Sequence, residues 1–231
     1  MKVFRPLEHL PLEEYLALEA ELVKSVDEPT LFTWIVSPTV IYGRHQVREQ
    51  EVNEAYCSAH KVRVVQRKSG GGCVYADAGN LMVSCVSPSN HQSPITNHQS
   101  PTTNYQLSII NYQFFMRMLA DALRQLGYEA VTTSHNDILV GGRKVVGTAS
   151  YQTPTGTVVH ASIAYDVDIN AMEQALTPSE AKLQKHAVAS VRQRVRNLRD
   201  IIDIGDISAF RIQLEEILTS KLYYTILPVS D

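Results

Sequence analysis

Short segments rich in β-forming residues run along this chain without the regular β-α-β repeat that a parallel sheet requires. One pair of segments is separated only by Gly141-Gly142, which is typical of a β-hairpin over 138–146. The other expected strands lie at 31–36, 39–42, 62–67, 81–86 and 158–167. The expected helices lie at 12–25, 49–61, 107–126, from the capping box 177–180 onward, and at 207–221. The pattern predicts an α+β fold of mixed, largely antiparallel β-sheets flanked by helices.

The composition is that of a folded chain, and it argues against nucleic-acid and membrane binding. Of the 231 residues, 44% are hydrophobic and 19% are charged, which is enough to bury a core in a single domain over 1–231. The net charge of -3 argues against a nucleic-acid-binding face, and no apolar run of about 18 residues is present to cross a bilayer. Three cysteines are too few for a disulfide framework or a zinc site, so a cytoplasmic location is expected.

A polar sequence with a period of seven interrupts the chain at residues 90–113. Pro94 and Pro101 occupy the same position of the repeat, and proline inside a helix costs about 3 kcal/mol, so these copies are not a coiled coil. We expect a low-complexity surface insertion at 88–106 that leaves any pocket intact. A histidine pair in it would lack the fixed geometry of a metal site, and no metal site is predicted.

The strongest local signal is the run Gly70-Gly71-Gly72, directly after a predicted strand. Consecutive glycines cost conformational entropy, but they let main-chain N–H groups approach a phosphate or a carboxylate closely. Arg67 stands just before them and adds a charge that suits phosphate. Two interpretations stay open at this point, an anion-binding loop and a glycine-rich hairpin turn.

Lys144 lies directly after the hairpin turn, at the start of an apolar strand. A lysine at a partly buried strand position is costly unless it meets an anion. An ammonium group near both a carboxylate and a phosphate is what acyl-adenylate chemistry needs, because charge develops on both groups. The alternative interpretation is a solvated hairpin lysine.

Taken together, three ordered blocks resemble the lipoate–protein ligase family, a branch of the biotin ligase and octanoyltransferase superfamily. The first block spans 66–80 and contains the glycine run. The second consists of Asn136-Asp137 and 143–149, and the third of Leu176, Pro178, Lys182-Leu183 and 190–198. The stretch 42–46 is similar to a further Gly-Arg-x-Gln motif of the family. The resemblance implies a biotin/lipoate ligase-like catalytic domain.

The resemblance also implies a two-step reaction. Lipoate and ATP give lipoyl-adenylate and pyrophosphate, and the lipoyl group then passes to a lysine of an acceptor protein. Lys144 would be the catalytic residue. ATP, which is expected to bring Mg²⁺, would be contacted by Arg67, Gly70, Gly71, Gly72, Cys73, Val74, Tyr75 and Lys144. The substrate pocket would include Asn136, Asp137, Gly147 and His160. The implied acceptors are lipoyl domains of 2-oxoacid dehydrogenase complexes or the glycine cleavage H protein.

The sequence departs from the family pattern at several points. Ala76 stands where the family has a histidine, and Ala161 follows His160 where the family has a glycine. Many of these ligases carry a C-terminal accessory domain that we expect to be absent here, so the chain is expected to need a separate accessory protein or activated lipoate. The stretch 182–199 contains six basic residues and no acid, and it is either a solvated surface or a docking site for an acidic acceptor: Lys182, Lys185, Arg192, Arg194, Arg196 and Arg199.

Other activities stay open. The related octanoyltransferases use a cysteine downstream of the second block, but this chain has no cysteine after Cys85, and Cys73 is expected to be a wall residue. An acyltransferase that acts from an acyl carrier or a lipoyl protein is the alternative enzyme. A non-catalytic module that binds lipoate or its adenylate is the alternative from another class, and biotin is a weaker alternative to lipoate.

Overall fold

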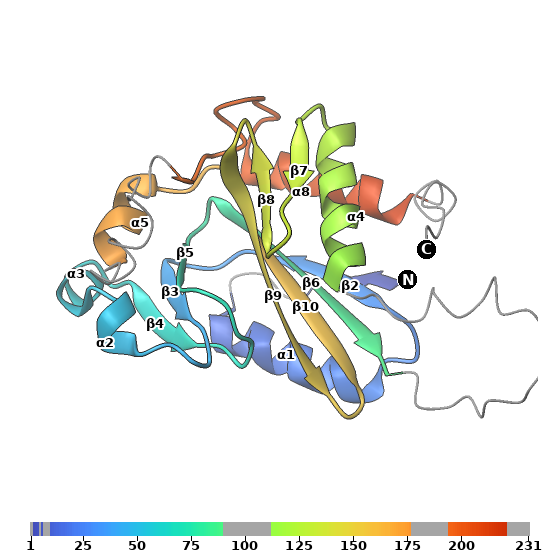
Figure 1. Cartoon of the computed structure of the whole chain (residues 1–231), viewed down its shortest axis with the longest axis horizontal. Coiled ribbons are helices and arrows are strands. Elements are labelled where there is room, and N and C mark those ends of the chain that lie inside the picture. Colours follow the sequence, from blue (N-terminus) through green and yellow to red (C-terminus); the bar gives the residue numbers. More distant parts are fainter. Residues whose placement is uncertain (1, 5, 7–9, 90–111, 177–193, 221–231) are drawn as a thin grey trace, which may run out of the picture.

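Two β-sheets form the frame of the molecule, which is seen here as a computed structural model (Figure 1). The structure describes residues 2–4, 6, 10–89, 112–176 and 194–220. The strands of the large sheet are β1 (Lys2–Phe4), β2 (Thr30–Trp34), β6 (Asn80–Pro88), β7 (Ala130–Thr132), β8 (Asp137–Val140), β9 (Arg143–Thr153) and β10 (Gly156–Ala164). The strands of the small sheet are β3 (Thr39–Tyr42), β4 (Arg63–Gln66) and β5 (Val74–Ala76).

The strand order confirms the predicted α+β class. Within the described residues the large sheet runs β1-β2-β6-β10-β9-β8-β7 and the small sheet runs β4-β3-β5. In this part of the chain the parallel neighbours are β1 with β2 and β3 with β4, and the other neighbouring strands are antiparallel. The longest antiparallel ladders join β10 to β6 and β10 to β9, so these three strands form the centre of the large sheet.

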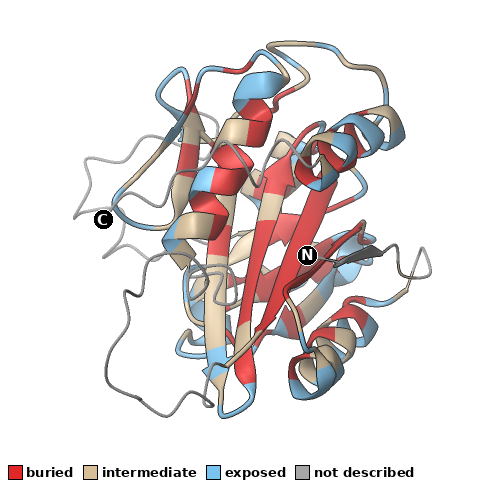
Figure 2. Cartoon of the chain, turned by 90° about the vertical axis from the view of Figure 1, so that its right-hand side faces the viewer, coloured by how far each residue is buried: buried red, intermediate tan, exposed pale blue. Residues whose placement is uncertain are grey.

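Helices cover both faces of the large sheet. Helix α1 (Leu12–Ser25) packs against β6 and β10 on one face, while α4 (Tyr112–Gln125) and α8 (Ile207–Thr219) pack on the other face. Along β6, Leu81 and Val83 belong to the core beneath α4 and α8, whereas Met82 and Val86 belong to the core beneath α1. Figure 2 shows the resulting burial along most of β6 and β10. Because β6 is buried on both faces, its apolar residues point to both cores rather than alternating with exposed polar ones.

The small sheet packs against two short helices, α3 (Glu54–Ala59) and α5 (Ile169–Ala175). The predicted helix at 49–61 is wrong as a single element, because α2 (Arg48–Glu51) and α3 are separated at Val52 and Asn53. Val52 forms a β-bridge with Leu176, and the Asn53 side chain accepts a hydrogen bond from the Tyr56 amide to cap α3. Helix α5 and the three-residue strands β1, β5 and β7 were not predicted, because segments this short do not show a period.

Several predictions fall on residues outside the described part of the chain. These are the insertion beyond Ser89, the beginning of the helix predicted at 107–126, the helix predicted from 177–180, and Lys182, Lys185 and Arg192 of the basic stretch. The described residues include no helix that is long and apolar enough to cross a membrane. The chain enters the insertion at the end of β6, where Ser89 bonds to the turn between β9 and β10. Lys144 lies near the opposite end of β9.

The hairpin of β8 and β9 is the one predicted from the Gly141-Gly142 pair. Both glycines have positive φ angles, 57° and 74°, which is the conformation that a two-residue hairpin turn requires. A register shift occurs between Ile138 and Leu139, so that Leu139 pairs with Lys144 while Asp137 pairs with Gly147. The irregularity sets the positions of the site residues on these strands.

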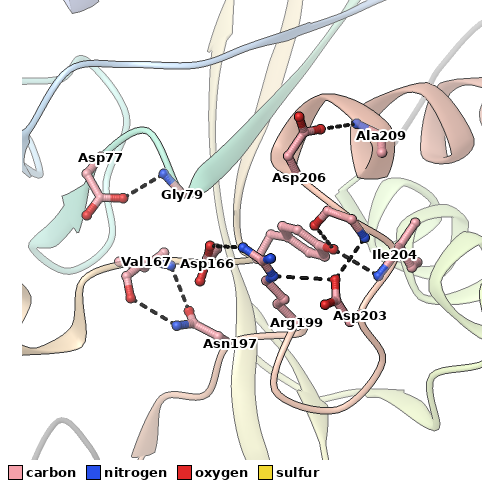
Figure 3. A network of polar contacts seen from close by, with 12 residues as sticks. Asp77, Gly79, Asp166, Val167, Asn197, Arg199, Asp203, Ile204, Asp206 and Ala209 are labelled. Atoms are coloured by element: carbon pink, nitrogen blue, oxygen red, sulfur yellow. Dashed lines mark hydrogen bonds and ion pairs between the residues drawn. The ribbon is translucent and has the colours of Figure 1, made fainter.

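A network of polar contacts fastens the segment 194–206 to the end of β10 (Figure 3). The Asn197 side chain donates to the carbonyl of Val167 at 2.9 Å and accepts from the amide of Val167 at 3.0 Å. Arg199 forms an ion pair with Asp166 at 2.6 Å. Because Asn197 is buried and satisfies both backbone groups of one residue, it fixes the path of the chain here.

Candidate active site

The glycine run forms a loop between β4 and β5 that is held from within by Arg67. The Arg67 side chain is buried and donates to three backbone carbonyls: Nη1 to Ile41 at 3.0 Å, and Nη2 to Gly70 at 2.8 Å and to Gly72 at 2.6 Å. Nε also donates to Gly70, at 3.2 Å. Burial lowers the pKa of the Arg67 guanidinium, but arginine starts from so high a value that it keeps its charge. Most of the hydrogen-bond donors of Arg67 therefore hold the backbone of the loop in place.

The hydrogen bonds of Arg67 also decide where the loop amides point. In a trans peptide unit the C=O and the following N–H point in opposite directions. The carbonyls of Gly70 and Gly72 point at Arg67, so the amides of Gly71 and Cys73 point away from it. In the described structure no residue accepts a hydrogen bond from the amides of Gly70, Gly71 or Gly72. Amide donors without a protein acceptor suit an anion.

Two positions in this region require glycine. Gly71 has a φ of +89°, and a Cβ there would lie 3.0 Å from Nη2 of Arg67. A Cβ on Gly43 would lie only 2.4 Å from the carbonyl oxygen of Gly71. The Gly-Arg-x-Gln stretch at 42–46 thus packs directly against the backbone of the glycine loop. The amide of Arg44 also donates a hydrogen bond to the carbonyl of Ser69 at 3.0 Å.

Lys144 reaches across its own strand to the neighbouring one. Its ammonium group lies 2.6 Å from Oδ1 of Asp137, and both side chains are about a third exposed, 31% and 30%. The path of the side chain crosses Gly147, where a Cβ would lie 2.9 Å from both Cε and Nζ of Lys144. Lys144 is therefore neither fully solvated nor buried without a counter-charge.

The segment after residue 193 borders Lys144 on its other side. Val195 forms a parallel β-bridge with Lys144, and the amide of Arg196 donates to the carbonyl of Lys144 at 3.0 Å. Asn197 follows directly and is clasped to Val167 as described above. The polar network of Figure 3 thereby fixes the backbone beside Lys144.

A narrow cavity of about 80 Å³ opens next to the glycine loop. Apolar side chains from α1 and the sheet form much of its wall: Leu12, Leu16, Trp34, Ile41, Met82, Ala149 and Ala161. Polar side chains also line it, among them those of Arg67, Asn136, Lys144 and His160. A slender apolar chain with one charged end fits a wall of this composition.

A wider cavity of about 440 Å³ adjoins the first. Its walls come from β5, the β8–β9 hairpin, α5 and the segment after residue 193 and include Tyr75, Asp137, Leu139, Met172 and Arg194. Five residues line both cavities: Cys73, Val74, Lys144, Gly147 and Ser162. Lys144 therefore stands where the narrow apolar cavity meets the wider, more polar one.

Residues 5–219, which are most of the chain, match the family described as the lipoyl protein ligase A/B catalytic domain. The chain belongs to this family. It is 32% identical over 190 residues to lipoate–protein ligase 1 of Staphylococcus aureus, an alignment that covers 81% of this chain and 53% of that protein. The chain thus spans about half the length of the curated relatives it matches.

Solved structures of lipoate ligases share the fold of this member of the lipoyl protein ligase family. A bipartite lipoate protein ligase from Thermoplasma acidophilum, described with its E2 lipoyl domain, superposes with a TM-score of 0.74 at 24% identity, covering 100% of this chain and 87% of that chain. A lipoate–protein ligase A bound with ATP gives a TM-score of 0.72 at 23% identity, covering 96% of this chain and 86% of that chain. At these identities the likeness establishes the fold.

The residues that the ligase resemblance singled out gather at the two cavities, with two exceptions. Arg67, Gly72, Asn136 and His160 line the narrow cavity, Tyr75 and Asp137 line the wide one, and Cys73, Val74, Lys144 and Gly147 line both. Gly70 and Gly71 line neither cavity, and Gly71 is exposed on the loop. Cys73 is thus a wall residue in position, as expected from the sequence.

Sequence reasoning missed several residues of this ligase-family site. Trp34 and Ser162 line the cavities without belonging to any recognised block, and Arg194 lines the wide cavity although the sequence singled it out only as part of the basic stretch 182–199. Glu19 is fully buried beneath the site, and here a signal was available. It follows Tyr15 by four residues and precedes Val23 by four, so it falls on the buried face of α1, where a carboxylate needs partners.

Because Mg²⁺ is expected together with ATP, the carboxylates that line this site are of interest. In the described parts of the chain no group of three or more His, Cys, Asp or Glu side chains is placed to hold a metal ion. Mg²⁺ in nucleotide sites is commonly held by one or two carboxylates together with phosphate oxygens and water. Asp137 is a carboxylate on the wall of the wide cavity and fits that limited role.

Proposed function

We propose that this chain attaches lipoate to a lysine of acceptor lipoyl domains in an ATP-dependent reaction through lipoyl-adenylate. The observation that carries the proposal is the position of Lys144 at the meeting point of the two cavities. Membership of the lipoyl protein ligase family and the S. aureus relative, itself a lipoate–protein ligase, support the same activity.

The narrow cavity is proposed to hold the lipoyl chain, because its wall is largely apolar and Lys144 lines it where it meets the wide cavity. The acyl carboxylate would then lie at Lys144. The wide cavity is proposed to hold the nucleotide, with its phosphates toward the glycine loop, which reaches this cavity at Cys73. The ATP bound to the structural neighbour supports a nucleotide here. Mg²⁺, where present, would be held by Asp137 and the phosphates and would neutralise part of their charge.

Lys144 has a defined role in this scheme. The carboxylate oxygen of lipoate forms a bond to the α-phosphorus of ATP while the bond to pyrophosphate breaks, and negative charge grows on the phosphoryl oxygens. An ammonium group fixed beside both reacting groups stabilises that charge, an effect worth about 10²–10³ in rate for a single such donor. In the second step the acceptor amine bonds to the acyl carbon, and AMP leaves with the electron pair of the broken bond.

Arg67 is proposed to act mainly as a positioning residue for the ATP-binding loop rather than as a direct ligand. Four hydrogen bonds from its side chain go to backbone carbonyls of Ile41, Gly70 and Gly72, which leaves few donors for a phosphate. Cys73, Val74 and Tyr75 stay predicted contacts of the nucleotide, and Asn136, Asp137, Gly147 and His160 stay predicted pocket residues.

The acceptors and the accessory protein are proposals as well. We propose lipoyl domains of 2-oxoacid dehydrogenase complexes or the glycine cleavage H protein as acceptors, a choice that the Thermoplasma ligase described with its E2 lipoyl domain supports. That ligase is bipartite, which supports a separate accessory protein for this catalytic domain too. We propose a cytoplasmic location, since none of the three cysteines forms a disulfide.

The experiment is the mass of an acceptor lipoyl domain after incubation with the chain. One reaction contains lipoate and ATP, a second contains preformed lipoyl-adenylate, and a third contains an acyl carrier protein loaded with octanoate and no ATP. We expect lipoylation in the first two reactions. Modification in the third reaction alone would identify an acyltransferase, and ligand binding without any modification would identify a binding module.

A further inference from the structure

Beneath the glycine loop, three buried polar side chains from three separate elements form one hydrogen-bonded chain. Oγ of Ser69 lies 2.8 Å from Nε2 of His160, and Nδ1 of His160 lies 3.1 Å and 3.3 Å from the two carboxylate oxygens of Glu19. Ser69 and Glu19 are fully buried, and His160 is only 8% exposed. Ser69 belongs to the loop, His160 to β10 and Glu19 to α1.

The carboxylate of Glu19 has further donors that fix its position. The hydroxyl of Ser84 donates to Oε1 of Glu19 at 2.7 Å, and the indole of Trp34 donates to Ser84 at 2.9 Å. A carboxylate only accepts, so the hydrogen on the imidazole is assigned to Nδ1, and Nε2 is left to accept from Ser69. The contact with Glu19 thus leaves Nε2, the nitrogen of His160 without a hydrogen, facing Ser69.

The order serine, histidine, carboxylate is also that of a nucleophile with its base. Accessibility argues against that use here. Ser69 is fully buried and lines neither cavity, so an acyl carbon in the narrow cavity has no path to its oxygen. His160 itself does line the narrow cavity. The contact instead ties Ser69, the residue directly before the glycine run, to the central strand β10.

We infer that His160, oriented by Glu19, is a positioning residue that holds the glycine loop through Ser69 in its anion-binding shape. Arg67 fixes the carbonyls of Gly70 and Gly72, and His160 fixes the side chain of Ser69, directly before the glycine run. With both anchors in place, the loop amides are held ready before a ligand arrives, which lowers the ordering cost of binding. The inference rests on the proposed function, because it takes the anion to be the phosphates of ATP.

The test is a double-mutant cycle with Ser69→Ala and Glu19→Gln, two residues that line neither cavity and do not touch each other. ATP binding in the presence of Mg²⁺ is measured by calorimetry, and lipoate binding is followed by the emission of Trp34, the one tryptophan of the chain, which lines the narrow cavity. We expect each variant to weaken ATP binding by roughly 5–20-fold, the effect of one lost hydrogen bond, and to change lipoate binding by less than about twofold. Because both substitutions act through His160, the double variant should have about the same affinity for ATP as the single variant with the larger loss.

Ser87→Ala is the matched control, since Ser87 is a buried serine on β6 that lines neither cavity, and it should bind ATP like the wild type. Glu19→Gln keeps the side-chain volume and serves as the main variant if Ser69→Ala does not fold. Unchanged ATP binding, multiplied effects in the double variant, or covalent labelling of Ser69 by a fluorophosphonate would each overturn the inference while leaving the proposed function intact. A wild-type chain that binds no ATP would overturn both.

Discussion

Lys144 forms its ion pair with Asp137 by passing over Gly147, the residue that pairs with Asp137 in the sheet. The register shift between β8 and β9 places Gly147 opposite Asp137, where an unshifted ladder would place Val146. The absence of a side chain at Gly147 then opens the path. One bulge and one glycine thus aim the ammonium group at the meeting point of the two cavities.

Gly147→Ala should therefore lower activity more than stability. The added Cβ would lie 2.9 Å from Cε and Nζ of Lys144, which are the far end of a flexible side chain and can move aside. The fold should tolerate this, but the ammonium group would leave its place, and misplacement by about 1 Å costs on the order of 10- to 100-fold in rate.

The measurement is the rate of acceptor lipoylation, with the thermal midpoint taken on the same preparation. A Gly147→Ala protein with a normal midpoint and a normal rate would show that the path of Lys144 over this glycine is unimportant. In a Lys144→Ala background the same substitution should have no further effect on the rate.

Asn197→Ala should destabilise the protein. It leaves both the amide and the carbonyl of Val167 without their partner in a buried place, at a cost of about 2–4 kcal/mol in the free energy of unfolding. Urea unfolding followed by circular dichroism measures this. Glu21→Ala, which removes only an exposed pairing with Lys24, is the control and should change the free energy little. Equal effects of the two substitutions would contradict a structural role for Asn197.

The cysteines should differ sharply in reactivity. Burial raises the pKa of Cys85 to about 12 and raises the pKa of Cys57, whereas Cys73 is partly exposed on the walls of both cavities. A thiol reagent at pH 8 should modify Cys73 quickly and the other two only after unfolding, and bound lipoate with ATP should slow the reaction of Cys73.

The pH dependence of the buried thiols has a definite sign. Because folding raises the pKa of Cys85, its neutral thiol favours the folded state at pH values below the ordinary thiol pKa of about 8.5. That contribution falls as the pH rises toward 12. Fast labelling of Cys85 in the native protein at pH 8 would show that its environment is open to solvent.

The candidate site was predictable from the sequence to the extent that it rests on local blocks. Arg67, the glycine run and Lys144 stand out because each residue type is unfavourable for folding at its position unless it serves a ligand. The contacts that join them come from distant parts of the chain and leave no local trace. The link from Glu19 to His160 spans 141 residues, and the use of the Arg67 donors on carbonyls follows from the loop conformation rather than from residue types.

The fold, too, was predictable where the signal is local and not where it depends on distant contacts. Strands and helices with a clear period, such as α1 and β3, agree closely with the prediction, and the hairpin turn at Gly141-Gly142 follows from turn chemistry. The split between α2 and α3 could not be read locally, because it depends on the bridge from Val52 to Leu176, far along the chain. Strands of three residues carry too little sequence to reveal a period.

The most direct measurement is lipoyl-adenylate formation by Lys144→Ala, with Lys24→Ala as an exposed lysine control, under conditions in which the wild-type chain modifies its acceptor. The variant should fold normally, because Lys144 is not a core residue. It should form adenylate more slowly by a factor of about 100 or more, as expected for the loss of a charge-stabilising group. Lys24→Ala should match the wild type. Adenylate formation by Lys144→Ala at the wild-type rate would contradict the assignment of this lysine to the chemistry.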